Sequence, residues 1–209
     1  MKNKGMFLPA AKYSLFTPLF DFFCEAIGLG SEYRRKIIDV MGLKNEKFKV
    51  LDVGCGTGSL LIDIKRNYSH LEAHGIDPDK NILGNAAKKA EKNNVKIKFD
   101  CAYAQKLPFP SNYFDVALSS LAIHHIPSEY KQKALEEIHR VIKSKGFFML
   151  VDFGKTKRFP IGAWLAATFE EGKENYEGLI PEMMKKAGFK QIKVMAEYKY
   201  GIQMIKCSK

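Results

Sequence analysis

The sequence lacks the features that mark disulfide-rich, metal-binding or membrane-spanning proteins. It has four cysteines in 209 residues, with no CxxC pair and no histidine at zinc-finger spacing. These cysteines indicate reduced thiols, so we expect a cytoplasmic protein without a metal. The apolar run YSLFTPLFDFFCEAIGLG carries Asp21 and Glu25, which argues against a transmembrane span, and the basic start MKNKGMFLPAAK has too short an apolar stretch for a leader. Repeats and linkers are also missing, so a single domain is predicted.

Basic residues are in excess. The 34 lysines and arginines outnumber the 23 acidic residues and give a formal net charge of +11. We interpret this charge mainly as a lysine-rich, solvated surface. The alternative is a basic field that attracts an anionic membrane, a nucleic acid or an acidic substrate.

The chain alternates between short apolar runs and helix-like segments. Apolar runs stand at 48–53, 72–77, 95–99, 114–120 and 146–153, and helical patterns lie between them at 59–67, 79–93 and 129–143. Repetition of strand and helix predicts a parallel sheet with helices on both faces.

Both ends depart from this alternation. Helical stretches are predicted at 13–27 and 31–41, and again at 161–171 and 179–187. The segments FKQIKVMAEY and YGIQMIKC then form two strands, joined so closely that they must be antiparallel. The prediction is an α/β, Rossmann-like sheet of seven strands, mostly parallel, with an antiparallel C-terminal hairpin and helices on both faces.

A glycine-rich loop follows the first predicted strand. Gly54, Gly56 and Gly58 form GxGxG between that strand and a helix, where ligands bind in open α/β sheets. The dinucleotide fingerprint would require a glycine at the position of Ser59. Asp52 also places a carboxylate beneath the loop, which would repel a pyrophosphate and favour an ammonium or sulfonium group.

A second acidic residue, Asp77, ends the second strand in GIDPD. A carboxylate there can accept hydrogen bonds from both hydroxyls of a ribose. The alternative is that Asp77 or Asp79 caps the helix that opens with Pro78. Both roles can hold at once, with Asp79 capping the helix and Asp77 facing a ligand.

These segments resemble a known family. VLDVGCGTGSL, GIDPDKNIL, AQKLPFPSNYFDVALSSLAIHH and LEEIHRVIKSKGFFMLVDF resemble the successive motifs of class I S-adenosylmethionine-dependent methyltransferases. Within that class the chain is similar to the group that contains type-11 enzymes and ubiquinone and menaquinone C-methyltransferases. The resemblance implies methyl transfer from S-adenosyl-L-methionine to a small or lipid-like acceptor.

The resemblance also implies roles for individual residues. The loop that contains Gly54, Cys55, Gly56 and Gly58 would let the backbone approach the methionine end and the ribose of the cofactor. Asp52 would lie near the methionine ammonium, Asp77 would bind the ribose hydroxyls, and Pro78 would flank the adenine. Ser119, at the same edge of the sheet, is a further candidate for cofactor binding. An N-terminal aromatic residue, Tyr13 or Phe16, would pack against the cofactor.

The chain departs from the family at positions 103 and 104. Members commonly have an aspartate there, followed by a small residue, and the aspartate accepts from the adenine amino group. This chain has Tyr103 and Ala104. A backbone group, the Tyr103 hydroxyl or Asp100 would have to replace the missing acceptor, and Ala104 is expected to keep a backbone contact.

The segment SSLAIHHIP, at 119–127, offers a candidate base. His124 is predicted to face the active site, where a histidine can take up a proton. The alternative is that one of the two histidines packs under the next helix while the other is solvated. No third ligand stands at a spacing that suits a metal. The Asn/Asp-Pro-Pro-aromatic motif of enzymes that methylate nucleobases is also absent, so nucleic acid is not the expected partner.

The expected organisation is one methyltransferase domain with three parts. Residues 1–45 are predicted as an N-terminal helical lid, 46–155 as the cofactor-binding core, and 156–209 as acceptor-side helices with the C-terminal hairpin. The aromatic-rich lid suggests an apolar acceptor, and the basic surface suggests peripheral contact with an anionic membrane. A noncatalytic S-adenosylmethionine-binding module and a nucleic-acid methyltransferase are the alternatives.

Overall fold

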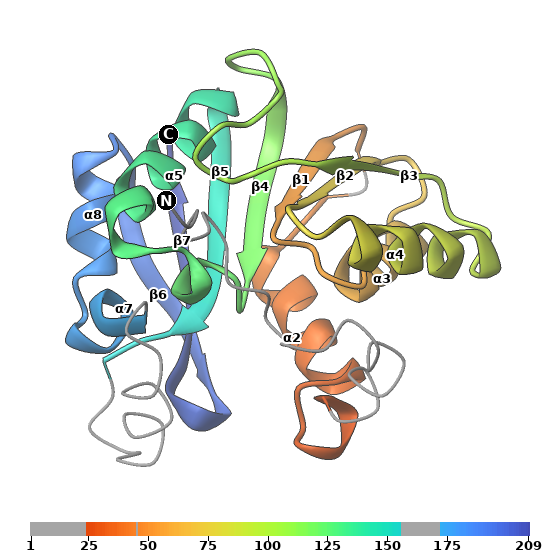
Figure 1. Ribbon diagram of the computed structural model, residues 1–209, viewed down its shortest axis with the longest axis horizontal. Coiled ribbons are helices and arrows are strands. Elements are labelled where there is room, and N and C mark those ends of the chain that lie inside the picture. The colour runs from red at the N-terminus through yellow and green to blue at the C-terminus, as the bar shows by residue number, and fades with distance from the viewer. Residues whose placement is uncertain (1–23, 45, 156–171) are drawn as a thin grey trace, which may run out of the picture.

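The computed structural model describes residues 24–44, 46–155 and 172–209. Figure 1 shows a single sheet with helices packed around it. The strands are β1 (Lys49–Val53), β2 (Glu72–Asp77), β3 (Ile97–Cys101), β4 (Phe114–Ser120), β5 (Ile142–Phe153), β6 (Lys190–Tyr198) and β7 (Ile202–Ser208). The α-helices are α2 (Ser31–Met41), α3 (Ser59–Asn67), α4 (Lys80–Lys92), α5 (Ser128–Val141), α7 (Lys173–Glu177) and α8 (Ile180–Lys186), and short 3₁₀ turns are η2 (Ile123–His125) and η4 (Lys199–Gly201).

The strand order confirms the predicted fold. The seven strands are arranged β3-β2-β1-β4-β5-β7-β6. β1 to β5 pair in parallel, whereas β7 is antiparallel to both β5 and β6. The order reverses between β1 and β4, and the crevice at such a point is where ligands of open α/β sheets bind.

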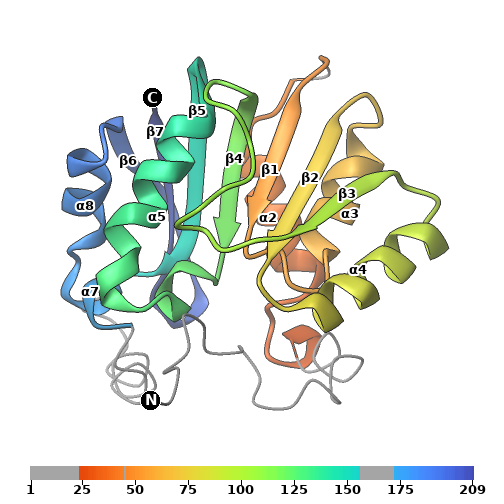
Figure 2. The same ribbon diagram turned by 45° about the horizontal axis from the view of Figure 1, so that its top comes forward.

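Side-chain alternation along the central strands divides the core into two layers. Leu51 and Val53 of β1 face the layer that contains α5 and α8, while Val50 faces the layer that contains α2 and α3. Figure 2 shows helices on both faces of the sheet, in agreement with these layers. Asp52 lies on the same face of β1 as Val50, because alternate residues of a strand share a face.

Local sequence explains where several elements begin and end. Asp79 caps α4, since its Oδ1 accepts from the backbone N–H groups of Asn81 and Ile82. Gly42 ends α2 in the left-handed conformation.

Some predicted boundaries were wrong. α5 ends at Val141 rather than Lys143, because the N–H groups of Asn112 and Tyr113 donate to the carbonyls of Arg140 and Val141 that another helical turn would need. β3 runs two residues later than predicted, and α7 was not predicted. The predicted helix at 161–171, most of the one at 13–27, and the lid aromatics Tyr13 and Phe16 lie outside the described residues.

No helix among the residues that the structure describes is both long enough and apolar enough to cross a bilayer.

Candidate functional site

The glycine-rich loop joins β1 to α3 at the carboxyl edge of the sheet. Gly54, Gly56 and Gly58 all have positive φ, at 75°, 52° and 73°. A Cβ atom on Gly54 would lie 2.4 Å from the Cβ of Ala122, so this loop and the loop after β4 are in close contact there. A Cβ on Gly56 would meet nothing within 4 Å. Gly54 is therefore required for packing, whereas Gly56 borders open space that a ligand can approach.

This difference leads to a first prediction. Gly56→Ala should weaken cofactor binding about tenfold, because the methyl group would enter the space beside the loop and the positive φ would be strained. Gly84→Ala is the matched control: Gly84 also borders open space but lies inside α4, where alanine should raise stability by about 1 kcal/mol. Calorimetric titration with S-adenosylhomocysteine checks both variants. Equal affinities would show that the loop does not contact the cofactor.

Asp77 connects the glycine-rich loop to the start of α4. Its Oδ2 accepts from the N–H of Gly56 at 3.1 Å, and its Oδ1 accepts from the N–H of Asp79 at 2.9 Å. The side chain is buried, at 7 % exposure, and burial raises its pKa. Each oxygen keeps a further lone pair. Asp79 caps the helix, and Asp77 keeps acceptor capacity that its two backbone partners do not use.

Asp52 is the least satisfied polar group of the site. It is only 2 % exposed, and its Oδ1 is fully buried without a hydrogen-bond partner in the part of the chain that the structure describes. Burial, together with the nearby Asp77, raises the pKa of Asp52 to about 8. A buried carboxylate without a partner is costly, and a cationic ligand would remove that cost.

The remaining candidates near the loop differ in how they are placed. The Oγ of Ser119 is fully buried and donates to the carbonyl of Val53 at 2.8 Å, so its proton is not available to a ligand. Cys55 is half-buried beside the two acids, and burial raises the pKa of its thiol. The loop therefore presents its backbone, rather than a reactive thiol, to a ligand.

The adenine-side candidates lie at the ends of β2 and β3. The N–H of Ala102 donates to the carbonyl of Asp77 at 3.3 Å, and the thiol of Cys101 lies 3.5 Å from the carbonyl of Pro78. These contacts bring Pro78 beside the segment that contains Tyr103 and Ala104. Tyr103 is 36 % exposed, so its ring is accessible at this edge.

His124 lies in η2, which is separated from β4 by two residues, and His124 is 6 % exposed. Its Nδ1 is 2.7 Å from Oδ1 of Asp152, and its backbone N–H donates to Oδ2 of the same carboxylate at 3.1 Å. Sequence reasoning missed Asp152. The available signal was an acidic residue at the end of a buried apolar strand, the same signal that identified Asp52 and Asp77. The described residues contain no group of three or more metal-ligating side chains.

The strand order and the acids that flank the glycine-rich loop define a Rossmann-like, nucleoside-binding class of protein. Comparison with known proteins narrows this class. Residues 50–146 match the family described as "Methyltransferase domain". The chain is 27% identical over 212 residues to the ubiquinone/menaquinone biosynthesis C-methyltransferase of Rickettsia akari, covering 88% of this chain and 82% of that protein.

Two further relatives match a smaller share of their own length. The phosphoethanolamine N-methyltransferase of Plasmodium falciparum is 34% identical over 129 residues, which cover 62% of this chain and 47% of that enzyme. The solved structure of Haemonchus contortus phosphoethanolamine N-methyltransferase 2 in complex with S-adenosyl-L-methionine superimposes with a TM-score of 0.73 at 21% identity. It covers 89% of this chain and 44% of that one, so the chain spans less than half the length of both proteins.

Over residues 50–146 and in its strand order, the chain is similar to the class I S-adenosylmethionine-dependent methyltransferases. The cofactor of the family is S-adenosylmethionine. The described residues fit this cofactor: Oδ1 of Asp52 has no partner among them and could accept from an ammonium group, Asp77 keeps free lone pairs for hydroxyls, and Gly56 leaves space for close approach.

Proposed function

We propose that the protein transfers the methyl group of S-adenosylmethionine to a small-molecule acceptor. The observation that carries this proposal is the buried carboxyl group of Asp52 beneath the glycine-rich loop, whose Oδ1 has no partner among the described residues. Such a group is stabilised by a cation, and the methionine end of the cofactor carries one.

The roles of the chain's own residues follow from their positions. The cofactor supplies an electrophilic methyl group on a sulfonium. Asp52 would hold the ammonium, and Asp77 would accept from the ribose hydroxyls while it keeps Gly56 in place. The close contact between Gly54 and Ala122 sets the β4 loop against the cofactor loop. Alignment of the reactants and exclusion of water then supply most of the acceleration.

The acceptor that we propose is a small molecule, and more specifically a lipid-like one. The names of two relatives support a small molecule, since one acts in ubiquinone and menaquinone biosynthesis and the other is a phosphoethanolamine N-methyltransferase. The first of these relatives covers most of both chains, which favours an apolar, quinone-like acceptor over phosphoethanolamine.

One assay tests the proposal. The protein is incubated with S-adenosylmethionine and either phosphoethanolamine or a reduced demethylmenaquinone, and release of S-adenosylhomocysteine is followed by mass spectrometry. We expect turnover with the quinone-type probe. Binding of S-adenosylhomocysteine without turnover on either probe or on a wider metabolite panel would favour the noncatalytic module. Salt-sensitive binding to RNA or DNA, with methylation of it, would favour the nucleic-acid enzyme.

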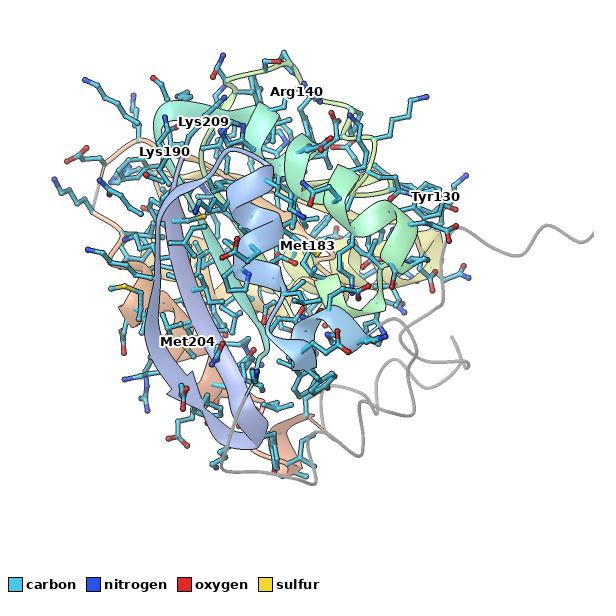
Figure 3. All side chains as sticks on the ribbon, turned by 90° about the vertical axis from the view of Figure 1, so that its left-hand side faces the viewer. Tyr130, Arg140, Met183, Lys190, Met204 and Lys209 are labelled. Atoms are coloured by element: carbon cyan, nitrogen blue, oxygen red, sulfur yellow. The ribbon has the colours of Figure 1, made fainter. Side chains whose placement is uncertain are left out.

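A lipid-like acceptor would bring a cytoplasmic protein to the membrane surface. The edge strand β6 supports this part of the proposal, because Val194 and Met195 are 52 % and 49 % exposed and lie beside the exposed lysines Lys190 and Lys193. Lys190 is labelled at the start of this strand in Figure 3. Apolar side chains flanked by lysines suit an anionic lipid surface.

Vesicle flotation tests the membrane contact. The protein should float with phosphatidylglycerol vesicles and not with phosphatidylcholine vesicles. Addition of 0.5 M salt should reduce the bound fraction, because at this ionic strength charges are screened within about a few ångströms. Met195→Glu should reduce flotation at both salt concentrations. Equal flotation of this variant would contradict a role for β6.

A further inference from the structure

The carboxylate of Asp152 contacts His124 at two places, the backbone N–H and the ring. Asp152 is the second-last residue of β5, and His124 follows the neighbouring strand β4, in which Ser120 pairs with Val151. One oxygen, Oδ2, accepts from the backbone N–H of His124 at 3.1 Å. The other, Oδ1, contacts Nδ1 of the ring at 2.7 Å and also accepts from the N–H of Phe153 at 2.8 Å. The backbone and the ring of His124 are therefore fixed by one side chain.

The charge of Asp152 decides which ring nitrogen of His124 carries the proton. Burial alone would raise the pKa of Asp152, but His124 and the hydrogen bonds to the carboxylate more than offset it, so the pKa lies below its usual value. An ionised carboxylate can only accept hydrogen bonds. The Nδ1 of His124 must therefore be the donor, and in the neutral ring the lone pair is left on Nε2.

This lone pair is available to a ligand. No residue that the structure describes forms a hydrogen bond with Nε2 of His124. Across those same residues, Asp52 and His74 contain the only side-chain polar atoms that are fully buried without a partner. The Nε2 atom of His124 is not among them, so it remains accessible although most of the ring is buried.

The groups around the pair hold the ring of His124 in place. The ring centroids of His125 and His124 lie 4.0 Å apart. Burial is the main cause that lowers the pKa of His125 to about 4, and the charges of His124 and Lys131 lower it further. His125 is therefore neutral near pH 7 and competes poorly for a proton. The Phe153 ring contacts that of His124 edge-on at 5.0 Å and stacks on Tyr176 of α7 at 5.7 Å.

Hydrogen bonds connect helix α7 to α5 and to β5. The buried Lys131 donates to Glu174 at 2.9 Å, and the side chain of Asn175 donates to the carbonyl of Phe153 at 3.4 Å. Asp152 and His125 are in direct contact with His124. One contact further out lie Lys131 on α5, whose charge acts on His125, and Tyr33 on α2 and Tyr176 on α7, on which the charge of Asp152 acts.

We propose that Asp152 is a positioning residue that fixes His124 in the Nδ1–H form, so that His124 Nε2 takes a proton from the acceptor, which must therefore carry an ionisable O–H, N–H or C–H at the methylated atom. This proposal rests on the proposed function and deepens it. It excludes acceptors that need no base, such as thioethers and tertiary amines.

The electron pair of the acceptor atom forms the new bond to the methyl carbon, and the pair of the broken carbon–sulfur bond remains on sulfur. The proton of the acceptor atom passes to Nε2 of His124. Asp152 stabilises the resulting imidazolium, and the proton then leaves to water.

The test is a direct observation of the ring. Long-range ¹H–¹⁵N spectra of the full chain, recorded with S-adenosylhomocysteine at alkaline pH, should show His124 protonated at Nδ1, with the signals assigned by their loss in His124→Gln. In Asp152→Asn the amide can donate to Nδ1, so the proton should move to Nε2. Asp152→Glu should restore the Nδ1–H form. A wild-type ring protonated at Nε2, or an unchanged tautomer in Asp152→Asn, would overturn the proposal.

Controls separate this inference from the proposed function. Asp115→Asn is the matched variant: Asp115 also accepts from a backbone N–H, that of Lys49, but lies at the start of β4, so the His124 tautomer should not change. The affinity for S-adenosylhomocysteine should be the same in wild type and Asp152→Asn. If wild type fails to bind it, the proposed function fails; if it binds but the tautomer is wrong, only the inference fails. On an acceptor found in the turnover assay, Asp152→Asn should lower kcat about a hundredfold with little change in KM for S-adenosylmethionine.

Discussion

Asp77→Ala is expected to reduce the affinity for S-adenosylhomocysteine more than tenfold while the protein still folds. The variant would lose two charge-assisted hydrogen bonds to the ribose, which contribute on the order of 1.5–3 kcal/mol. It would also release the N–H of Gly56, which Asp77 holds at 3.1 Å, so the glycine-rich loop would become less ordered. Calorimetric titration measures the dissociation constant, and an unchanged value would refute the ribose assignment.

Asp79→Ala is the control for this variant. Asp79 is two residues away and caps α4 through the N–H groups of Asn81 and Ile82. Its loss should lower the free energy of unfolding by about 1 kcal/mol, as for other N-caps, and leave cofactor affinity nearly unchanged. If both variants lost affinity to the same extent, the effect of Asp77 would come from the start of α4 rather than from contact with the ribose.

Most of the fold could be predicted from the sequence because the patterns that indicate strands and helices are local. The alternation of apolar runs and helices predicted the parallel strands, and the short connection before Ile202 predicted the antiparallel pair. The end of α5 was wrong by two residues because it depends on Asn112 and Tyr113, which lie about 30 positions earlier in the chain and take up the helix's last carbonyls. Such a distant pairing leaves no periodic trace in the helix itself.

The residues of the candidate site also differ in whether a local pattern could identify them. Gly54 and Asp77 belong to contiguous motifs, so the sequence could assign them before their geometry was known. Asp152 could not be linked to His124 because 28 positions separate them, and only the pairing of β4 with β5 brings them together. Ser119 was correctly placed at the edge of the sheet, but its hydroxyl proton is used by Val53, a contact that depends on how β1 and β4 pack.

Among the described residues Oδ1 of Asp52 has no partner, so ionisation of this carboxyl group should lower the stability of the free protein and raise its affinity for a cationic ligand. The pKa of Asp52 is raised from 3.8 to about 8 in the folded protein, so the native state binds more protons than the unfolded state between these values. The free energy of unfolding without cofactor should therefore fall as pH rises from about 4 to about 8, by on the order of 5 kcal/mol. Affinity for S-adenosylhomocysteine should rise over the upper part of the same range, because the ionised carboxylate binds the ammonium.

Asp52→Asn should separate the two effects. The amide has nearly the same size and no charge to bury, so the variant without cofactor should melt several degrees higher than wild type at pH 8, and by a smaller margin at pH 5.5. Its affinity for S-adenosylhomocysteine should fall about tenfold or more at pH 8 and lose its dependence on pH, because an amide does not attract the ammonium. Thermal unfolding and calorimetric titration at both pH values measure these changes. A variant that melted below wild type at pH 8 would show that Asp52 already has a partner in the folded protein, and unchanged affinity would place the ammonium elsewhere.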